Sequence, residues 1–414
     1  MNKQWHHGNL IRLLENGEEY FPSVFAAIRN AQHEIFIETF ILQDDKVGRQ
    51  LRTELIDAGN RGVRISITVD GFGSPGLEGD FINGITGAGV KFHIFNPGYA
   101  LLGVRTNLFR RLHRKLVVVD ASIAYIGGIN FIEDQLTEFG PQAKRDYAIE
   151  IEGPAAKEMR DFAEQAIRRP QLNWRALSER RYQRKLKALQ KISEDTNANS
   201  EQTGAHVLFV TRDNRFERTA IERYYQLAFR TARRELIVAN AYFFPGYHLL
   251  RRLRQAARRG VDVSLILQGH PDIPIVKWGA RLLYGYLLSA GVKIYEYYER
   301  PLHGKVAIAD DDWATVGSSN LDPLSLSLNL EANVIIRDRE FNRELRGRLI
   351  HLIENHCKMM ALEKVPRHTW WRAVMSAAVF HFLRYFPRWA DLLPTHTVTL
   401  KKVKIENRNK LDLS

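Results

Sequence analysis

Two stretches of this 414-residue chain decide its fold: HRKLVVVDASIAYIGGIN, which begins at His113, and HGKVAIADDDWATVGSSN, which begins at His303. Both read H-x-K-x-x-x-x-D, and in both a Gly follows seven residues after the Asp and an Asn closes the unit. The matched positions are His113, Lys115, Asp120, Gly127 and Asn130 in the first stretch and His303, Lys305, Asp310, Gly317 and Asn320 in the second. One such triplet arises by chance roughly a few times per hundred chains of this size, but two copies in register are far rarer. One half-site is therefore duplicated.

The repeat extends over most of the chain. Three further pairs of segments match in order: AQHEIFIETFIL at Ala31 with ARRELIVANAYF at Ala232, NRGVRISITVDG at Asn60 with RRGVDVSLILQG at Arg258, and AGVKFHIF at Ala88 with AGVKIYEY at Ala290. In each half, apolar runs typical of buried strands alternate with amphipathic stretches typical of helices. This alternation predicts an α/β fold of two lobes, each a largely buried sheet flanked by helices.

The first half carries an insertion just before its motif. The two halves are 202 residues apart at Ala88 and Ala290 but only 190 apart at His113 and His303, so about twelve residues are extra. The inserted segment, NPGYALLGVRTNLFRRL (residues 96–112), mixes leucines with arginines. It is either a surface loop with a small core of its own or a lip that contacts an apolar, anionic substrate.

The length of the chain and the repeat together predict three parts. We expect an N-terminal lobe over residues 1–200, a C-terminal lobe over 201–360 and an extension over 361–414. The polar stretch SEDTNANSEQTG (residues 193–204) is the expected boundary between the lobes. The basic run at 175–191 before it is either a solvated helix face or a connecting helix that also contacts an anionic surface.

The charge of the chain predicts a polyanionic partner. The formal net charge is +13 and the isoelectric point is about 9.7, which suits either nucleic acid or anionic lipid. Cys357 is the single cysteine, so no internal disulfide forms, as suits a reducing compartment. We find neither a secretory signal at the start nor an apolar run long enough to span a membrane.

A segment near the C-terminus has the composition of a membrane-surface helix. HTWWRAVMSAAVFHFLRYFPRWADLL (residues 368–393) places aromatic and aliphatic residues at helical spacing, with arginines beside them and Pro387 at the end. Aromatic and basic residues around a short apolar stripe favour a helix that lies among lipid headgroups. The alternative is a helix that packs against the catalytic core.

The residues of each motif supply a base beside a fixed charge. On a strand, His113 and Lys115 point to the same side, because side chains alternate, and the second copy behaves likewise. Asp120 and Asp310 lie at an odd offset from their histidines and should face away. We expect these two aspartates to organise the motif through hydrogen bonds.

Small and polar residues after each motif offer donors to an anionic oxygen. Gly128 and Asn130 in the first copy, and Ser318 and Asn320 in the second, let backbone and side-chain groups approach such an oxygen closely. A tight turn is the alternative reading of either copy alone. We expect these four residues to contact substrate.

Each catalytic ring also needs a carboxylate to orient it. Asp146 and Glu331, each near the start of the apolar strand that follows its motif, are the candidates, and the alternative for either is a surface or capping acid. No group of His, Cys, Asp or Glu has zinc or calcium spacing, so we expect no metal and no other cofactor.

Two histidines and two lysines that meet across a lobe interface would form one site for a phosphodiester. One neutral imidazole attacks phosphorus to form a phosphohistidine, and the other, protonated, donates to the departing alcohol and then deprotonates the acceptor. Lys115, Lys305, Asn130 and Asn320 would neutralise charge on the phosphoryl oxygens. The residues themselves do not distinguish which histidine takes which part.

The paired H-x-K-x-x-x-x-D motif with its trailing G-x-x-N resembles the phospholipase D superfamily over nearly all of residues 20–355. Within it, ANAYFFP at Ala239 and NLDPLSLSLNLEANV at Asn320 are similar to bacterial cardiolipin synthases, most closely their B type. The resemblance implies two lobes of mixed β-sheet flanked by helices, related by a pseudo-two-fold axis, with one active site between them.

The resemblance also implies the activity: transfer of a phosphatidyl group from one phosphatidylglycerol to another, giving cardiolipin and glycerol. His113, Lys115, Asp120, His303, Lys305 and Asp310 are the implied catalytic residues, with the first-half histidine favoured as nucleophile. The implied location is the cytoplasmic face of the bacterial inner membrane, as a peripheral membrane protein bound to anionic phospholipid. The oligomeric state stays open.

Three other functions fit parts of the sequence. A nuclease of the same superfamily would suit the basic charge, but the apolar insertion and the Trp-rich segment favour lipid, so we expect no nucleic-acid partner. A hydrolase would let water replace the acceptor alcohol. A binding protein with a degenerate site would not keep both motifs intact.

Overall fold

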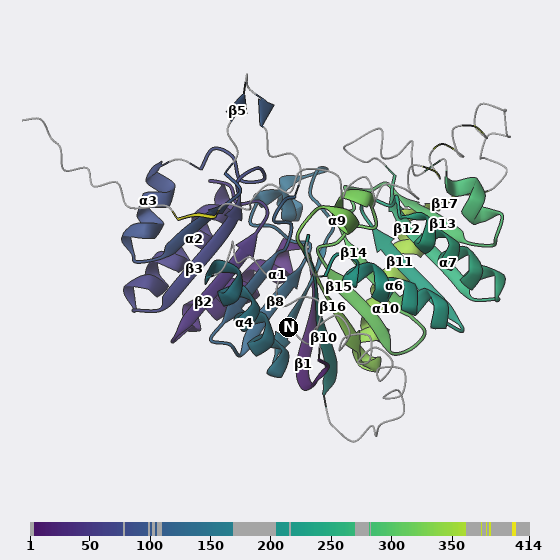
Figure 1. The fold of residues 1–414 in the computed structure, drawn as a ribbon, viewed down its shortest axis with the longest axis horizontal. Coiled ribbons are helices and arrows are strands. Elements are labelled where there is room, and N and C mark those ends of the chain that lie inside the picture. Colours follow the sequence, from purple (N-terminus) through teal and green to yellow (C-terminus); the bar gives the residue numbers. More distant parts are fainter. Residues whose placement is uncertain are drawn as a thin grey trace, which may run out of the picture.

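The computed structural model describes residues 4–77, 79–97, 100–101, 104–105, 110–168, 204–214, 217–269, 281, 283–361, 374, 378, 381 and 400–402. Its two α/β lobes lie side by side (Figure 1). The expected lobe boundary, the basic run at 175–191, about half of the insertion and nearly all of the 368–393 segment fall outside the described residues.

The first lobe contains nine strands, four α-helices and two short 3-10 helices among the described residues. In chain order they are β1 (His6–Glu15), α1 (Asn16–Asn30), β2 (Glu34–Thr39), α2 (Lys46–Asn60), β3 (Arg64–Asp70), α3 (Gly79–Gly87), β4 (Lys91–Phe95), β5 (Ala100–Leu101), β6 (Val104–Arg105), β7 (Leu116–Val119), β8 (Ile123–Gly127), η1 (Glu133–Gln135), η2 (Thr137–Phe139), β9 (Tyr147–Glu152) and α4 (Pro154–Arg168). Strands β5 and β6 pair only with each other.

The second lobe repeats this order. Its elements are β10 (Ala205–Arg212), α6 (Ala220–Thr231), β11 (Glu235–Asn240), α7 (Tyr247–Arg258), β12 (Asp262–Gln268), β13 (Lys293–Tyr297), β14 (Lys305–Ala309), β15 (Trp313–Gly317), α9 (Pro323–Ser327), β16 (Glu331–Arg337), α10 (Arg339–His356) and β17 (Cys357–Met359). A last strand, β18 (Leu400–Lys402), returns to the first lobe and pairs with β4.

The sheet shows the duplication directly. Read outward from the centre, its strand order is β1-β9-β8-β7-β2-β3-β4 in one lobe and β10-β16-β15-β14-β11-β12-β13 in the other. In each lobe the last three strands are parallel and the others antiparallel. The predicted α/β fold of two mixed-sheet lobes is confirmed.

One feature of the sheet was absent from the sequence prediction. Strands β1 and β10 pair antiparallel at the centre, so the two half-sheets join into one sheet of sixteen strands. The β1 sequence, HHGNLIRLLE, lacks the alternation of apolar and polar residues that marks a strand with one buried face.

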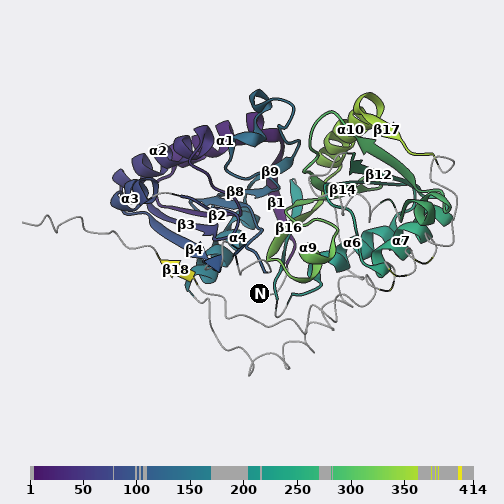
Figure 2. The same ribbon diagram turned by 90° about the horizontal axis from the view of Figure 1, so that it is seen from above.

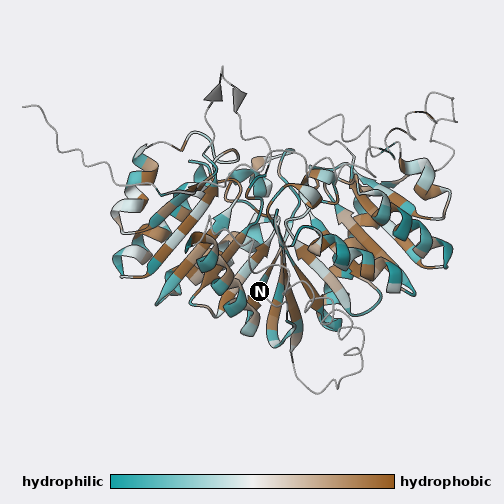
Figure 3. Ribbon diagram, viewed as in Figure 1, coloured by the Kyte–Doolittle hydropathy of each residue, from teal (hydrophilic) through white to brown (hydrophobic). Residues whose placement is uncertain are grey.

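Helices cover both faces of each half-sheet (Figure 2). Helices α1, α2 and α3 pack on one face of the first half-sheet, and α6 and α7 take the equivalent place in the second. Helices α4 and α10 contribute to a third core, which runs across both lobes. Strands β2 (EIFIET) and β11 (ELIVAN) are buried on both sides, and each has an apolar run in its middle with polar residues at both ends (Figure 3). In the described part of the chain, no helix combines the length and apolarity needed to cross a bilayer.

Candidate active site

The two motif histidines are held by carboxylates from opposite lobes. The Nδ1 atom of His113 lies 3.0 Å from the carboxylate of Glu331, which begins β16 of the second lobe. The Nδ1 atom of His303 lies 2.5 Å from Asp146 of the first lobe. Both carboxylates are fully buried. Each half-site is thus completed by the other lobe.

Backbone hydrogen bonds fix the same crossed arrangement. The amide of His113 donates to the carbonyl of Leu330 at 2.9 Å, and the amide of Leu330 donates to the carbonyl of Arg111 at 2.8 Å. In the mirrored position, the amide of His303 donates to the carbonyl of Arg145 at 2.7 Å. The residues beside each carboxylate therefore pair with the residues beside the opposite histidine.

Both lysines are buried and bind the backbone of their own histidine. Lys115 Nζ donates to the carbonyl of His113 at 2.7 Å, and Lys305 Nζ donates to the carbonyl of His303. The strands begin later than the sequence predicts, at Leu116 in β7 and at Lys305 in β14. Neither histidine lies within a strand, so the predicted alternation along one strand is wrong at these positions, and the lysine–carbonyl bond fixes the local geometry.

The imidazoles and the amines influence one another across the interface. Burial lowers the pKa of both His113 and His303, and the lysine of each motif lowers it further. The charge of Lys305 also lowers the pKa of His113, while Lys115 and His113 lower that of His303. Groups that are 190 residues apart in sequence therefore form one electrostatic cluster.

Burial also shifts the amines and one carboxyl toward neutrality. It lowers the pKa of Lys115 to about 7 and that of Lys305 to about 8, and it raises the pKa of Asp146 to about 6. Burial acts on Glu331 in the same direction as on Asp146, but His113 and Lys115 outweigh it and leave the Glu331 pKa below its ordinary value. The pKa of Asp146 thus lies above that of Glu331, so Asp146 takes up a proton first as the pH falls.

The small residues after each motif lie against these carboxylates. Ser318 Oγ donates to Glu331 at 2.5 Å. Its counterpart Gly128 lies so close to Asp146 that a Cβ atom there would overlap the carboxylate. Asn130 accepts from the amide of Ile41 at 3.1 Å, and Asn320 Oδ1 is buried without a partner in the structure.

The structure places the motif aspartates away from the rings. Asp120, at the far end of β7 from His113, accepts from the amides of Gln32, His33 and Glu34 at 2.8 Å each. Asp310 binds the amides of residues 233–235 in the same way, and both aspartates have φ near +51°. The hydrogen-bonding part expected of them is the one the geometry shows. The geometry does not place either aspartate among the catalytic residues, because each one binds backbone amides in a turn away from the histidines.

Sequence reasoning missed a second pair of equivalent residues. Asp70, at the end of β3, accepts from the amide of Leu112 at 2.7 Å, and Gln268, at the end of β12, accepts from the amide of Leu302 at 2.8 Å. Each fixes the residue just before a motif histidine. The sequence does show that these two positions are equivalent, since TVDG and LILQG end two of the matched segments.

Phe40 is another missed residue, and only one lobe has it. Its ring centroid lies 5.0 Å from that of His113, and Lys115 Nζ lies 5.3 Å from the same ring. The matched segments place Ala241 at this position in the second lobe. The aromatic ring beside His113 therefore has no counterpart at the matched position of the second lobe.

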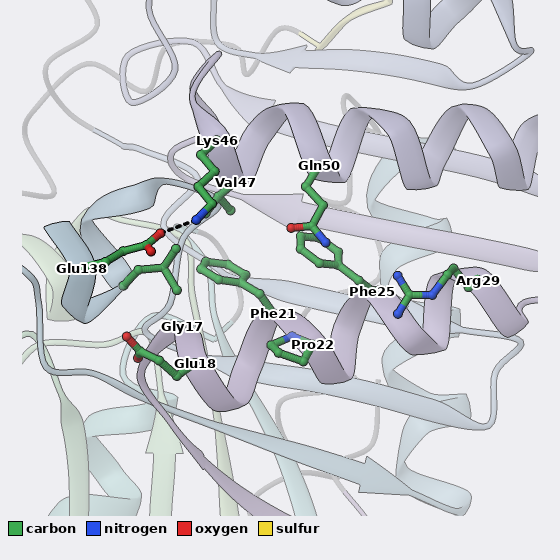
Figure 4. Close-up of a pocket in the computed structure, with 11 residues that line it drawn as sticks. Gly17, Glu18, Phe21, Pro22, Phe25, Arg29, Lys46, Val47, Gln50 and Glu138 are labelled. Carbon is green, nitrogen blue, oxygen red and sulfur yellow. Dashed lines mark hydrogen bonds and ion pairs between the residues drawn. The ribbon is translucent and has the colours of Figure 1, made fainter.

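A separate cavity of about 490 Å³ lies between α1 and α2 on the outside of the first lobe (Figure 4). Phe21 and Phe25 form its apolar wall, and Lys46 and Glu138 pair across it at 2.5 Å. No motif residue lines it. In the part of the chain that the structure describes, no three His, Cys, Asp or Glu side chains gather as metal ligands would.

A family model described as the phospholipase D-like domain of cardiolipin synthase matches residues 24–167 and 227–353, one range in each lobe. The chain belongs to the phospholipase D superfamily. The resemblance carried by the doubled motif is thereby confirmed. Cardiolipin synthase B of Salmonella typhimurium is 50% identical over 401 residues, which cover 96% of this chain and 94% of that protein. Cardiolipin synthase B of Escherichia coli (strain K12) is 50% identical over 403 residues, which cover 97% and 94%.

A solved structure of the superfamily shares the fold. The crystal structure of phosphatidylserine synthase from Haemophilus influenzae superimposes with a TM-score of 0.64 over 92% of this chain and 94% of that one, at 15% identity. At this low identity the superposition shows a shared fold and carries no information about the substrate.

Proposed function

We propose that this protein is a cardiolipin synthase, which moves a phosphatidyl group from one phosphatidylglycerol onto a hydroxyl of a second and releases glycerol. The crossed pairs His113–Glu331 and His303–Asp146 carry the proposal, because they tie both imidazoles into one cluster with both lysines. The relatives that are 50% identical over nearly their whole length are named cardiolipin synthase B, which supports the choice of lipid.

In the first step, Nε2 of His113 attacks the phosphorus of the donor lipid. An N–P bond forms, the P–O bond to the departing glycerol breaks, and His303 gives its ring proton to the glycerol oxygen. Lys115 and Lys305 balance the charge that develops on the phosphoryl oxygens. The free enzyme holds His303 mostly neutral, so the negative phosphate must raise its pKa on binding to supply the proton.

In the second step, a hydroxyl of the acceptor lipid attacks the same phosphorus. Its proton passes to the now neutral His303, an O–P bond forms and the N–P bond to His113 breaks. Both histidines then return to their starting states, and cardiolipin leaves. Water in place of the acceptor would give phosphatidic acid.

We assign the nucleophile to His113, as superfamily resemblance implies. The lowered pKa of Glu331 supports this assignment, because an ionised carboxylate at Nδ1 keeps the ring proton there and leaves the lone pair on Nε2. The same carboxylate stabilises the positive ring of the phosphohistidine. We propose direct substrate contact for Asn130, Asn320, Gly128 and Ser318. Ser318 binds Glu331, Gly128 lies against Asp146, and the Oδ1 atom of Asn320 is buried without a partner in the structure.

The remaining sequence predictions complete the proposal. The chain divides at about residues 200 and 360, and the protein binds the cytoplasmic face of the bacterial inner membrane as a peripheral protein. Its net charge of +13 supports attraction to anionic phospholipid. The segment at 361–414 adds to that attachment.

The direct test supplies labelled phosphatidylglycerol in mixed micelles, with and without a chelator, and separates the lipid products. We expect labelled cardiolipin in both cases and a loss of at least about 10³-fold in His113→Ala and in His303→Ala. His351→Ala, an exposed histidine of α10, is the matched control and should keep its activity. Phosphatidic acid as the only product, or nucleic-acid cleavage without lipid turnover, would overturn the proposal.

A further inference from the structure

The phenyl ring of Phe40 has no part in the chemistry above. Phe40 directly follows Thr39, the last residue of β2. Its ring centroid lies 5.0 Å from that of His113, and the two rings are tilted at 59° to each other. Lys115 Nζ lies 5.3 Å from the centre of the same phenyl ring, and the guanidinium carbon of Arg111 lies 5.9 Å from it. One half-buried ring therefore lies against the reacting imidazole and two cations.

The loop after β3 fixes the position of this ring. Ser74 Oγ donates to the carbonyl of Phe40 at 3.0 Å. Gly73 approaches the phenyl ring so closely that a Cβ atom there would lie 2.8 Å from two ring atoms. The carboxylate of Asp70 accepts from the amide of Gly73 at 2.9 Å and from the amide of Leu112 at 2.7 Å. The phenyl ring and the start of the first motif are thus anchored to the same carboxylate.

His113 becomes positive during the reaction, in surroundings that largely oppose the charge. Burial lowers its pKa and so do the charges of Lys115 and Lys305, whereas Glu331 raises it. A charge on this ring also opposes one on His303. The face of a phenyl ring attracts a cation within about 6 Å of its centre. It does so without the full negative charge of a further carboxylate, which would repel the incoming phosphate.

The matched position of the second lobe offers no such face. It is Ala241, which is buried and whose amide donates to the carbonyl of Gly304 at 3.1 Å. The backbone at this position therefore lies against the second motif, but its side chain ends at a methyl group. Phe40 thus adds to the difference between the two motifs, and it does so on the side of the histidine that bonds to phosphorus.

We propose that Phe40 is a positioning residue of the transfer reaction, which holds the His113 ring in line for attack and stabilises its positive charge once it is bonded to phosphorus. The inference rests on the proposed function, in which His113 carries the phosphatidyl group. The tilted ring contact limits rotation of the imidazole, and the face of the phenyl group attracts the charge that develops on it. Lys115 is held beside the same face.

The test replaces the phenyl ring and measures His113 directly. Phe40→Leu keeps an apolar side chain but removes the aromatic face, and Phe40→Tyr keeps both. Phe36→Leu is the matched control, because Phe36 lies in the same strand and its ring lies 5.7 Å from the guanidinium of Arg160, outside the site. One readout is the pKa of His113 in the free protein, from NMR of histidine-labelled samples in which His113→Ala assigns the signal. The other is kcat and KM for release of labelled glycerol from phosphatidylglycerol in mixed micelles. Thermal melts check folding, and Phe40→Met takes the place of Phe40→Leu if the latter does not fold.

We expect Phe40→Leu to lower the pKa of His113 by about 0.5 or more and to lower kcat by about threefold to thirtyfold, with KM nearly unchanged. Phe40→Tyr and Phe36→Leu should keep the wild-type pKa and a kcat within about twofold of wild type. An unchanged His113 pKa in Phe40→Leu, a rise in KM alone, or an equal loss in Phe40→Tyr would each overturn the role of Phe40. The pKa is measured without lipid, so the failure of the proposed function is seen separately. A wild-type protein that releases no glycerol would overturn that function, and the role of Phe40 in transfer with it.

Discussion

His113 and His303 occupy equivalent positions in the two lobes but meet different carboxylates. Glu331 is ionised, with a pKa below its ordinary value and a hydrogen bond from Ser318. Asp146 has a pKa of about 6, and the serine is replaced by a glycine. The duplicated frame places the two rings symmetrically, and the substitutions around it give them different protonation behaviour. A reaction that needs one nucleophile and one acid requires that difference.

The comparison is tested most strongly by removing the charge of each carboxylate. We expect Glu331→Gln to lower kcat by about 10²–10⁴-fold at all pH values, because the ring of His113 loses its ionised partner. Asp146→Asn should cost less at pH 5.5, where Asp146 is already largely protonated, than at pH 8. Glu150→Gln, in the strand β9 that begins just after Asp146, is the control. Equal losses for Asp146→Asn at both pH values would contradict the assigned pKa.

Substitution of the small residue beside each carboxylate tests the same difference between Asp146 and Glu331, with a smaller expected loss of activity. A methyl group at Gly128 would overlap Asp146, so Gly128→Ala should turn that carboxylate away from His303 and lower kcat by about tenfold to a hundredfold. Ser318→Ala removes one hydrogen bond from Glu331 and should cost less than about tenfold. Steady-state kinetics of the two variants give the two kcat values to be compared. The opposite order would show that Ser318, and not the close approach at Gly128, maintains the site.

The lysines predict how activity depends on pH. An amine carries charge below its pKa, and the pKa values of Lys115 and Lys305 are about 7 and 8. In the free enzyme the stabilising charge is therefore lost as pH rises through this range, and kcat/KM should fall by at least about tenfold between pH 7 and pH 9. Bound phosphate raises both pKa values, so the fall in kcat should come at higher pH. A flat kcat/KM profile over this range would rule out the lowered pKa values.

The motif aspartates should show the smallest effect, and the two lobes should behave alike. Asp120→Asn and Asp310→Asn each weaken three bonds to backbone amides and should lower stability by about 1–3 kcal/mol, measured as a lower urea midpoint. Asp161→Asn, on the surface of α4, is the control. A large loss of kcat at unchanged stability would make these aspartates direct participants in the reaction.

The repeat explains how much of the fold the sequence predicts. Matched apolar segments give the order of β2, β3 and β4 and of their counterparts, because buried parallel strands are nearly continuous apolar runs. Strand β1 was missed because its sequence is not alternating and it has its partners in distant parts of the chain, β9 and β10. Long-range pairing of this kind leaves no local pattern.

For the candidate site, too, the sequence predicts some of the residues and their partners but not others. Asp146 and Glu331 could be named from their places before an apolar strand. Which histidine each carboxylate binds could not be predicted, because each pair joins residues from different lobes that only folding brings together. Asp70 and Gln268 were passed over although their matched positions are visible, since an Asp and a Gln share only their function as hydrogen-bond acceptors.

A crystal structure with vanadate, a five-coordinate mimic of phosphate in transfer, tests the central claim most directly. We expect one vanadate between the two lobes, bonded to Nε2 of His113 and within hydrogen-bond distance of His303, Lys115 and Lys305. Two vanadates on separate rings, or one that touches the residues of a single lobe, would contradict a shared site.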